Sequence, residues 1–286
     1  MQDLKGKVAV ITGGASGIGF ALAERAVVEG MSVAVCDIEV GALERAAAKL
    51  RTGGAKVVSY RVDVSKEAEV EAAASAIYTE FGAVHLVCNN AGVLNQDKPT
   101  WEHPIADWQW LFSVNVMGVV HGVRAFVPRM LAGGQDGHIV NTASMAGLVT
   151  GRPGAAVYDA SKHAVLSLSE SLYRDLVVTT PKLSASVLCP GAVMTNIWTA
   201  ERNRPGAAPG EQPQDGGTAF TGDSFPPSEM ANRVFDAVAA NRFYVLGAQD
   251  EMYEWTKMGH DRMWEGRNPA VAHRLIVERD ARLASE

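Results

Sequence analysis

The sequence has few cysteines and no clustered metal-binding residues. Its 286 residues include only three cysteines, Cys36, Cys88 and Cys189, each within an apolar run. An odd number of widely spaced cysteines argues against a disulfide framework or a zinc site. The seven histidines are scattered, with no H-x-x-x-H pair among them. We therefore expect buried free thiols and no metal centre.

The chain also lacks clustered positive charge and long hydrophobic runs. It has 26 lysines and arginines against 32 acidic residues, which gives a formal net charge of −6. No run of five basic residues occurs, so neither nucleic acid nor an anionic membrane is expected as a partner. No apolar run reaches the length of a membrane span, and the N-terminus lacks a signal-peptide pattern. These features favour a cytoplasmic protein that binds a small-molecule substrate.

Strand-like and helix-like segments alternate along most of the chain. Short apolar runs rich in β-branched residues predict strands near 7–12, 31–36, 56–62, 84–89, 137–143, 183–189 and 243–247. Helical periodicity predicts helices near 17–29, 41–51, 66–81, 107–131, 157–178 and 228–240. Continuously apolar strands that alternate with helices indicate a parallel sheet covered on both faces. We expect an α/β fold of the doubly wound type.

No internal repeat or change in composition marks a second domain, so residues 1–249 are expected to form one unit. Within it, residues 196–227 form a long segment rich in proline and glycine. This segment follows the carboxyl end of a strand, where open α/β sheets bind ligands, so we expect a substrate lid. Residues 250–286 form a tail rich in methionine and tryptophan, predicted to pack as a helix on the same domain. A capping helix or a subunit contact fits this pattern as well as a substrate role does.

A glycine-rich turn joins the first predicted strand to the first predicted helix. Its sequence is Thr12-Gly13-Gly14-Ala15-Ser16-Gly17-Ile18-Gly19. Glycines let the backbone approach a pyrophosphate closely, and the helix N-terminus supplies free N–H groups. The spacing G-x-x-x-G-x-G differs from the usual G-x-G-x-x-G pattern, but its position between strand and helix is the one a dinucleotide site requires. A purely structural turn is the alternative.

An acidic residue ends the second predicted strand. Asp37 lies twenty residues after Gly17. A carboxylate there would accept hydrogen bonds from the adenosine ribose and repel a 2′-phosphate. Neither Ile38 nor Ser16 supplies a cation for that phosphate, so NAD is favoured over NADP. A turn-capping aspartate is the alternative.

Polar and small residues follow the third and fourth predicted strands. Asp63, with Val64 beside it, either bonds the adenine amino group or only caps the helix that begins near Ser65. The fourth strand is followed by Asn89-Asn90-Ala91-Gly92. Small and amide side chains there suit close backbone approach to a cofactor, with a simple turn as the alternative.

Tyr158 and Lys162 lie four residues apart in a predicted helix, so both side chains point to one face. Free tyrosine has a pKa of about 10 and is a poor base at neutral pH. A nearby cation favours phenolate and lowers that pKa. Such a tyrosine can exchange a proton with a carbinol or carbonyl oxygen. An ordinary helix face is the alternative.

Taken together, these motifs resemble those of the short-chain dehydrogenase/reductase family. The matching features, in order, are T-G-x-x-x-G-x-G at 12–19, N-N-A-G at 89–92, Asn115, Ser144, Y-x-x-x-K at 158–162 and Pro190-Gly191. Their order and spacing agree with the family across residues 5–247. The resemblance implies a single Rossmann domain with a seven-stranded parallel sheet. It also implies a homo-oligomer, a dimer or a homotetramer.

The resemblance assigns roles to four residues. Tyr158 would be the general acid and base, and Lys162 would lower the pKa of Tyr158 and hold the nicotinamide ribose. Ser144 would orient the substrate oxygen, although Thr142 and Ser161 are nearby hydroxyls that could take its place. Asn115 would support a water chain that reaches Lys162, or would only bond the backbone within a helix.

The resemblance also places a nicotinamide contact after the sixth predicted strand. Pro190, Gly191, Val193 and Thr195 would lie against the carboxamide, with a rigid turn as the alternative. One departure from the family is Asp159, next to the tyrosine, where a small residue is common. An acidic side chain near a helix N-terminus favours the helix dipole, so Asp159 leaves the assignment of Tyr158 intact.

The substrate pocket is expected beside Leu94 and Asn95, within residues 145–152 and in the segment after Thr195. Its candidate lining is mostly apolar and comprises Met145, Leu148, Val149, Ile197, Trp198, Phe220 and Phe225, with Arg152 as the one candidate for binding a carboxylate. We expect an NAD-dependent oxidoreductase that transfers a hydride between the nicotinamide and a hydrophobic secondary alcohol or ketone. The alternatives are an NADP-preferring ketone reductase, a non-catalytic dinucleotide sensor of the same fold and a halohydrin lyase that uses no nucleotide.

Overall fold

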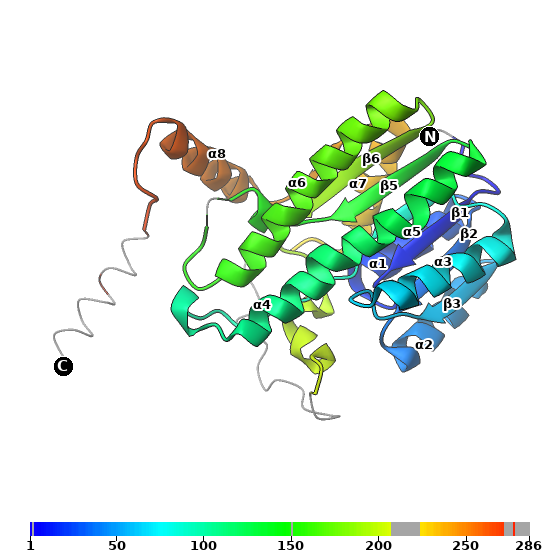
Figure 1. Cartoon of the computed structure of the whole chain (residues 1–286), viewed down its shortest axis with the longest axis horizontal. Helices are drawn as coiled ribbons and strands as arrows, with labels where there is room; N and C mark the ends of the chain where they lie inside the picture. Colours follow the sequence, from blue (N-terminus) through cyan, green and yellow to red (C-terminus); the bar gives the residue numbers. More distant parts are fainter. Residues whose placement is uncertain (2, 150, 207–223, 272–276, 278–286) are drawn as a thin grey trace.

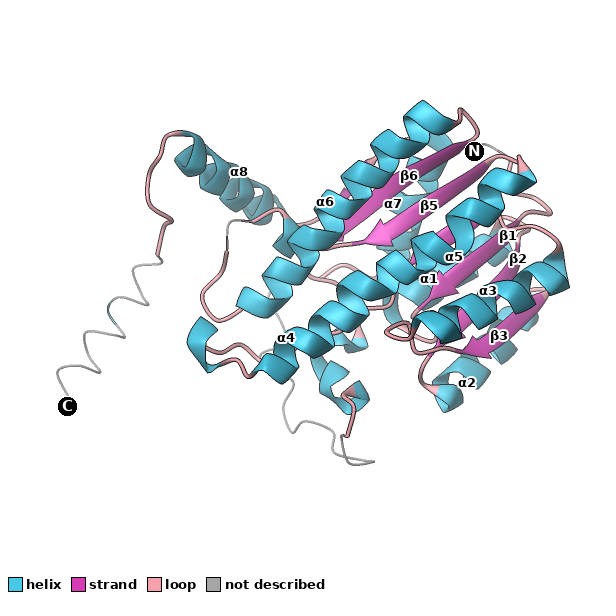
Figure 2. Ribbon diagram, viewed as in Figure 1, coloured by secondary structure: helices cyan, strands magenta, loops and turns pink. Residues whose placement is uncertain are grey.

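The computed structural model describes residues 1, 3–149, 151–206, 224–271 and 277. Seven parallel strands form one sheet in the order β3-β2-β1-β4-β5-β6-β7, which Figure 2 shows as a single twisted layer. The strands are β1 (Val8–Thr12), β2 (Ser32–Asp37), β3 (Val57–Arg61), β4 (Leu86–Asn89), β5 (Gly137–Thr142), β6 (Leu183–Pro190) and β7 (Tyr244–Gly247). The predicted doubly wound α/β fold and its seven strands are confirmed.

Helices cover both faces of the sheet (Figure 1). One face carries α1 (Gly17–Val28), α2 (Val40–Arg51) and α7 (Pro227–Ala240), and the other carries α3 (Glu67–Phe81), α5 (Gly118–Gly133) and α6 (Ala156–Thr179). Leu22 of α1 and Ile77 of α3, on opposite faces, are fully buried. Burial of one such side chain contributes about 1.5–3 kcal/mol. Two hydrophobic layers therefore hold the sheet in place.

The order of the strands reverses at β1, which creates the binding edge of the sheet. Ile11 of β1 pairs with Val35 of β2 on one side and with Cys88 of β4 on the other. The connections from β1 and β4 diverge from this point, which leaves a crevice at the carboxyl ends of the strands. The glycine-rich turn, Asp37 and the segment after β4 consequently meet at one edge.

A single helical run of 29 residues extends from Ile105 to Gly133, longer than the predicted helix at 107–131. It consists of α4 (Ile105–Leu111), a π-helical segment, η2 (Phe112–Met117), and α5. Its length and hydropathy would suffice to cross a membrane. No run of that length was expected from the sequence. Within the described residues 56% of its apolar window is buried, as in the core helix of a soluble protein.

The expected tail begins with α8 (Asp250–Trp264), which projects from the body in Figure 1. Met252 and Tyr253 in its first turn pack against a small apolar cluster of the body. The later apolar side chains are exposed, with Trp264 at 88%. The docking of the whole tail on the domain stays a prediction.

The expected lid falls partly within the described residues, and all three cysteines fall within them. The lid begins with a 3-10 helix, η4 (Asn196–Asn203), and residues 207–223 lie outside the described part of the chain. Cys36, Cys88 and Cys189 are free and buried, as predicted. Burial raises the pKa of each thiol to about 12, so none is a thiolate at neutral pH.

Candidate active site

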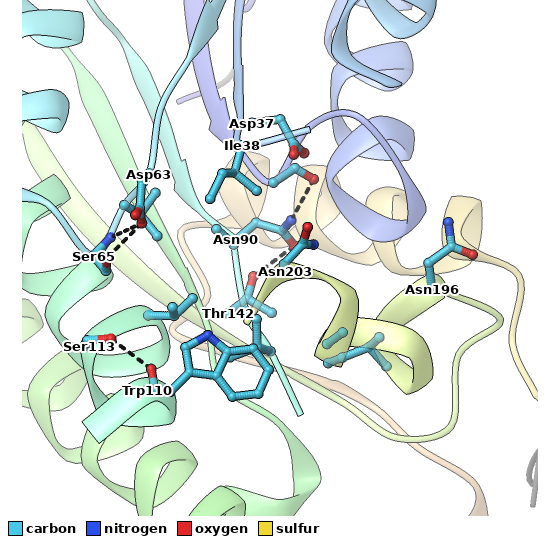
Figure 3. A pocket seen from close by; sticks show the side chains of 18 of the residues that line it. Asp37, Ile38, Asp63, Ser65, Asn90, Trp110, Ser113, Thr142, Asn196 and Asn203 are labelled. Carbon is cyan, nitrogen blue, oxygen red and sulfur yellow. Dashed lines mark hydrogen bonds between the residues drawn. The ribbon is translucent and has the colours of Figure 1, made fainter. Parts of the chain in front are cut away.

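A cleft of about 760 Å³ runs along the carboxyl edge of the sheet. Figure 3 shows side chains from several elements around it, among them Asp37, Asp63, Trp110 and Asn203. The glycine turn, the ends of β2 and β3, the segment after β4, and α4 contribute to its lining. The cleft thus collects residues that are up to 192 positions apart in the chain, from Gly13 to Pro205.

The glycine-rich turn carries no side chains at positions where a side chain would not fit. Its backbone can therefore approach a ligand closely. Gly13 and Gly17 have φ values of +63° and +53°, a conformation that favours glycine. A Cβ on Gly19 would lie 2.1 Å from the carbonyl oxygen of Gly13. These positions leave backbone N–H groups at the start of α1 open to the cleft, which suits an anionic pyrophosphate.

The segment after β4 is tied to the end of β1. Thr12 Oγ1 accepts hydrogen bonds from the backbone N–H of Asn90 at 2.9 Å and of Ala91 at 3.1 Å. Asn90 Nδ2 donates to the Thr12 carbonyl at 3.1 Å, and Thr142 Oγ1 donates to Asn90 Oδ1 at 3.3 Å. Asn90 and Thr12 therefore act together to fix the two loops that flank the switch point.

Asp37 lies at the cleft and is already hydrogen-bonded to the backbone. Its Oδ2 accepts from the Ala15 N–H at 2.9 Å, and its Oδ1 accepts from the Glu39 N–H at 3.0 Å. Burial raises the pKa of Asp37, while these N–H groups act against that shift. Each carboxylate oxygen keeps a further lone pair that a ribose hydroxyl could use.

Asp63 lies at the cleft as well, and its side chain stabilises a local turn before α3. Its Oδ1 accepts from the backbone N–H of Ser65 at 3.0 Å and from Ser65 Oγ at 2.7 Å. The expected helix cap is not formed, because α3 begins at Glu67 with Lys66 at its N-cap and without a side-chain cap. The contact with adenine stays a prediction, and Val64 lines the cleft beside it.

Tyr158 and Lys162 share one face of α6 and both line the cleft, as the spacing predicted. Lys162 is 2% exposed, and its Nζ donates to the Thr142 carbonyl at 3.1 Å. That nitrogen lies 5.6 Å from the centre of the Tyr158 ring. Ser144 follows β5; its Oγ donates to the Pro190 carbonyl at 3.4 Å and accepts from the Ala146 N–H at 3.1 Å, and it lies close enough to Tyr158 to act on the pKa of the phenol. A phenol, an ammonium and a hydroxyl therefore come together at this end of the cleft.

The pKa values at this site differ from the sequence expectation. Burial raises the pKa of Tyr158, although the Ser144 hydroxyl and the charge of Arg152 act to lower it. Burial also lowers the pKa of Lys162 to about 8. The expected lowering of the Tyr158 pKa by Lys162 is not found in the protein alone. Desolvation of the phenol outweighs the favourable charges and hydrogen bonds around it.

Asn115 lies in the π-helical segment η2, where the helix ladder is locally rearranged. Its Oδ1 accepts from the Val93 N–H at 2.8 Å, and its Nδ2 donates to the Val93 carbonyl at 3.0 Å. Nδ2 also donates to Ser161 Oγ at 3.0 Å. Asn115 thus holds the backbone after β4, and its part in a water chain that reaches Lys162 stays a prediction. Ser161 bonds Asn115 and the carbonyl of its own helix, so Ser144 remains the hydroxyl beside Tyr158.

Residues after β6 reach the cleft only in part. Pro190 and Thr195 line it, and a Cβ on Gly17 would lie 3.0 Å from Thr195 Cγ2. Gly191 donates its N–H to the Gly247 carbonyl at 2.6 Å, which ties this turn to β7. Val193 is buried in the core, so any contact with a ligand would come from its backbone.

Most of the expected substrate lining is not brought together in the cleft. Ile197 lines it, but Met145 is fully buried in the core and Phe225 pairs with Val193. Leu148 faces a separate cavity of about 440 Å³ beside α8. Val149 is buried and Trp198 is 38% exposed. Residue 150 and Phe220 lie outside the described residues.

Asn95 and Arg152, the two polar residues expected to contact the substrate, already form hydrogen bonds or ion pairs with other side chains of the protein. Asn95 Nδ2 lies 3.2 Å from His103 Nδ1 and donates to Asp107 Oδ2 at 3.4 Å. Arg152 Nη2 forms an ion pair with Asp159 Oδ1 at 2.6 Å. The Arg152 guanidinium is therefore already paired with Asp159, which makes it less suited to bind a carboxylate of the substrate.

One wall of the cleft was not predicted from the sequence. Residues of α4 and η2 form this wall, namely Ala106, Gln109, Trp110, Ser113 and Val114. Their spacing of three to four residues is a helical signal that could have identified one face. Glu39, Arg202 and Asn203 also line the cleft, and no short-range pattern connects them.

The chain is similar to known proteins of one family. The model of the short chain dehydrogenase family matches residues 7–206. A 1-deoxy-11-beta-hydroxypentalenate dehydrogenase of Streptomyces avermitilis is 36% identical over 283 residues, which cover 94% of this chain and 98% of that protein. A 3beta-hydroxysteroid dehydrogenase 2 of Eggerthella lenta is 36% identical over 202 residues, which cover 70% and 75% of the two chains.

A solved structure is similar along nearly the whole chain. It is a short chain dehydrogenase/reductase from Burkholderia phymatum in complex with NAD, with a TM-score of 0.88 and 42% identity. The match covers 95% of this chain and 99% of that one. The family model, the relatives and the shared fold lead to one conclusion: this chain belongs to the short-chain dehydrogenase family of oxidoreductases.

Proposed function

We propose that the protein is an NAD-dependent dehydrogenase that interconverts a hydrophobic secondary alcohol and its ketone. The observation that carries the proposal is that Tyr158 and Lys162 line a cleft that also holds Asp37, with Ser144 beside Tyr158. A proton-exchanging phenol and a ribose-binding carboxylate are the groups that such a reaction needs at the two ends of a dinucleotide. The similar Burkholderia structure, which contains NAD, supports the choice of cofactor.

The glycine turn would hold the pyrophosphate, and Asp37 would accept hydrogen bonds from the adenosine ribose. Lys162 would lie against the nicotinamide ribose. The bound cofactor supplies the chemistry of hydride transfer. Asp37 disfavours a 2′-phosphate by charge repulsion, which supports NAD over NADP.

Tyr158 and Ser144 would act on the oxygen of the substrate. Ser144 would donate a hydrogen bond to that oxygen and orient it, while the phenol of Tyr158 gives a proton to the developing alkoxide during reduction. During oxidation the phenolate takes the same proton from the alcohol. Since burial raises the pKa of Tyr158 above its ordinary value of about 10, oxidation should accelerate with rising pH as the small phenolate fraction grows, whereas reduction should lose its proton donor only in strongly alkaline solution.

The apolar wall beside Tyr158 supports a hydrophobic substrate. Trp110, Val114, Ile197 and Ala200 line the cleft there. The names of the Streptomyces and Eggerthella relatives both contain a hydroxylated compound that is dehydrogenated, which supports an alcohol. We therefore infer a secondary alcohol on an alicyclic or aromatic skeleton.

The test measures absorbance of the reduced nicotinamide while the protein is mixed with NAD or NADP and a panel of aliphatic, alicyclic, aryl and steroid alcohols. We expect NAD-dependent reduction with one class of alcohol. Tyr158→Phe should lower turnover at least about 100-fold while NAD affinity changes little. The matched control is Tyr60→Phe. Tyr60 lies in β3, at one edge of the sheet, and is not among the residues that line the cleft, so this variant should keep full activity.

Two outcomes would count against the proposal. NAD binding without turnover on any alcohol, ketone or aldehyde would favour the non-catalytic sensor. Turnover that survives Tyr158→Phe would remove the phenol from the reaction and would require another acid and base.

A further inference from the structure

We propose that Glu39 determines cofactor choice by occupying Arg202, which would otherwise bind the 2′-phosphate of NADP. This inference rests on the proposed preference for NAD and adds a second determinant to Asp37. The residues involved come from the loop after β2 and from the flap, defined here as residues 196–205.

Three hydrogen bonds converge on one oxygen of Glu39. Arg202 donates to Glu39 Oε1 from Nη2 at 2.6 Å and from Nε at 3.1 Å. Asn203 Nδ2 donates to the same oxygen at 2.9 Å. The side chains of Arg202 and Glu39 are 23% and 33% exposed, so the pair is partly shielded from water. The guanidinium is thereby engaged by a carboxylate of the protein.

This contact lies where the adenosine ribose is expected. The Glu39 N–H donates to Asp37 Oδ1, and Asp37, Glu39, Arg202 and Asn203 all line the same cleft. Figure 3 shows Asp37 and Asn203 around that cavity. A guanidinium beside the ribose is the usual partner of a 2′-phosphate because its planar donors match phosphate oxygens. The cleft therefore contains an arginine suited to NADP and a carboxylate that engages it.

The flap holds Arg202 in this place through contacts on the other wall of the cleft. Arg204 Nη2 donates to Asp107 Oδ1 at 2.7 Å, and its guanidinium lies 4.4 Å from the centre of the Trp110 ring. Ala200 is 4% exposed and packs in the same apolar cluster as Trp110. The position of Arg202 thus depends on anchors separate from Glu39, so loss of the Glu39 charge should leave the guanidinium near the ribose.

Charge balance explains why Glu39 would select NAD. Partial burial acts to raise the pKa of Glu39, but the hydrogen bonds from Arg202 and Asn203 lower it overall, so the carboxylate is ionised at neutral pH. The carboxylates of Asp37 and Glu39 both line this part of the cleft, where Glu39 engages Arg202 and is also attracted by the charge of Arg45. A 2′-phosphate would add about two negative charges to this group, as phosphate monoesters do. Removal of the Glu39 charge would free Arg202 to bind that phosphate. NAD has no 2′-phosphate, so its binding would gain no such contact.

The experiment measures the dissociation constants of NADH and NADPH by nucleotide fluorescence, which needs no substrate. The variants are Glu39→Gln, Arg202→Met, the double variant and Glu39→Asp. Glu39→Gln should lower the ratio of the NADPH constant to the NADH constant by about tenfold, the size of one charge-assisted contact. Arg202→Met alone should leave the ratio near that of the wild type. In the double variant the ratio of dissociation constants should return to near the wild-type value, because no guanidinium is left to bind the phosphate. Glu39→Asp keeps the charge and should retain the preference for NADH.

A control variant and the contrary outcomes separate this inference from the proposed function. Glu29→Gln breaks the Arg25–Glu29 pair on α1, away from the cleft, and should change neither constant. If the wild type prefers NADH but Glu39→Gln leaves the ratio unchanged, only the inference about Glu39 is wrong. Equal weakening of both nucleotides would also overturn it, because Glu39 would then only fix the flap. A wild type that binds NADPH as tightly as NADH would instead overturn the proposed NAD preference and this inference with it.

Discussion

Arg152 and Asp159 form an ion pair directly beside Tyr158. Arg152 Nη2 donates to Asp159 Oδ1 at 2.6 Å, and the Arg152 backbone N–H donates to Oδ2 at 3.0 Å. The Asp159 side chain is 4% exposed, whereas that of Arg152 is 44% exposed. The pair therefore joins the segment after Ser144 to the first turn of α6, and it places a cation near the phenol.

Replacement of Arg152 by methionine should destabilise the protein and alter the titration of Tyr158. Asp159 would keep the backbone hydrogen bond but lose its counter-ion while buried, which should cost about 1–3 kcal/mol in the free energy of unfolding. The Arg152 charge acts to lower the Tyr158 pKa, so its loss should move the pH profile of alcohol oxidation to higher pH. Urea unfolding and the pH dependence of kcat/KM measure the two effects.

The matched control for this prediction is Arg174→Met, which breaks an exposed ion pair with Glu170 on the same helix. Exposed pairs contribute about 0–1 kcal/mol, so this variant should unfold nearly as the wild type does. Equal stability of the two variants would show that the Arg152 pair has no structural role.

Asp37→Ala should relax the discrimination against NADP. The side chain removed here carries the charge that repels a 2′-phosphate, so we expect the NADPH-to-NADH ratio of dissociation constants to fall about tenfold. NADH should also bind more weakly, because the Ala15 and Glu39 N–H groups lose their acceptor. Asp37→Asn removes the charge but keeps an acceptor, so it separates the two effects. An unchanged ratio in both variants would remove Asp37 from the ribose site.

His138 should make the protein less stable in mild acid. This side chain is 1% exposed and its Nε2 lies 2.7 Å from Ser186 Oγ. Burial lowers its pKa to about 3, against about 6.5 in the unfolded chain. Below pH ~6.5 the His138 imidazole binds a proton in the unfolded state but not in the folded state. The free energy of unfolding therefore falls by ~1.4 kcal/mol for each unit by which the pH is lowered.

Urea unfolding of the wild type and of His138→Gln at pH 7.5 and pH 5 tests this contribution. The loss of stability on acidification should be smaller in the variant by about 2 kcal/mol. His260→Gln, on the projecting helix α8, serves as the control and should retain the wild-type dependence. A variant as acid-sensitive as the wild type would assign the effect to carboxylates alone.

Gly19→Ala should disrupt the glycine turn. The new Cβ would meet the Gly13 carbonyl oxygen at 2.1 Å and Asn90 Nδ2 at 2.6 Å, so the backbone must shift. We expect a destabilisation of about 1–3 kcal/mol and a marked loss of NADH affinity. Gly133→Ala is the control, because no atom lies within 4 Å of its Cβ. That variant should be neutral or up to about 1 kcal/mol more stable, and normal NADH binding by Gly19→Ala would contradict the close-approach argument.

The fold and the placement of Tyr158 beside Lys162 could be predicted because they depend on local patterns. Seven short apolar runs separated by amphipathic segments specify a parallel sheet with helices on both faces. Tyr158 and Lys162 share a helix face because four residues make about one turn. The glycine turn between β1 and α1 likewise depends on a few adjacent positions.

The sequence by itself therefore determined the class of fold, the edge of the sheet that binds ligands and the residues placed there by short spacings. Only the tertiary structure decided which distant side chains meet across the cleft. Arg202 and Glu39 are 163 residues apart, and no periodicity relates them. Tertiary packing also decided the direction of the Tyr158 pKa, because desolvation depends on everything that surrounds the phenol. Spacing along a chain fixes which side chains share a face, whereas burial and long-range contact depend on how the whole chain packs.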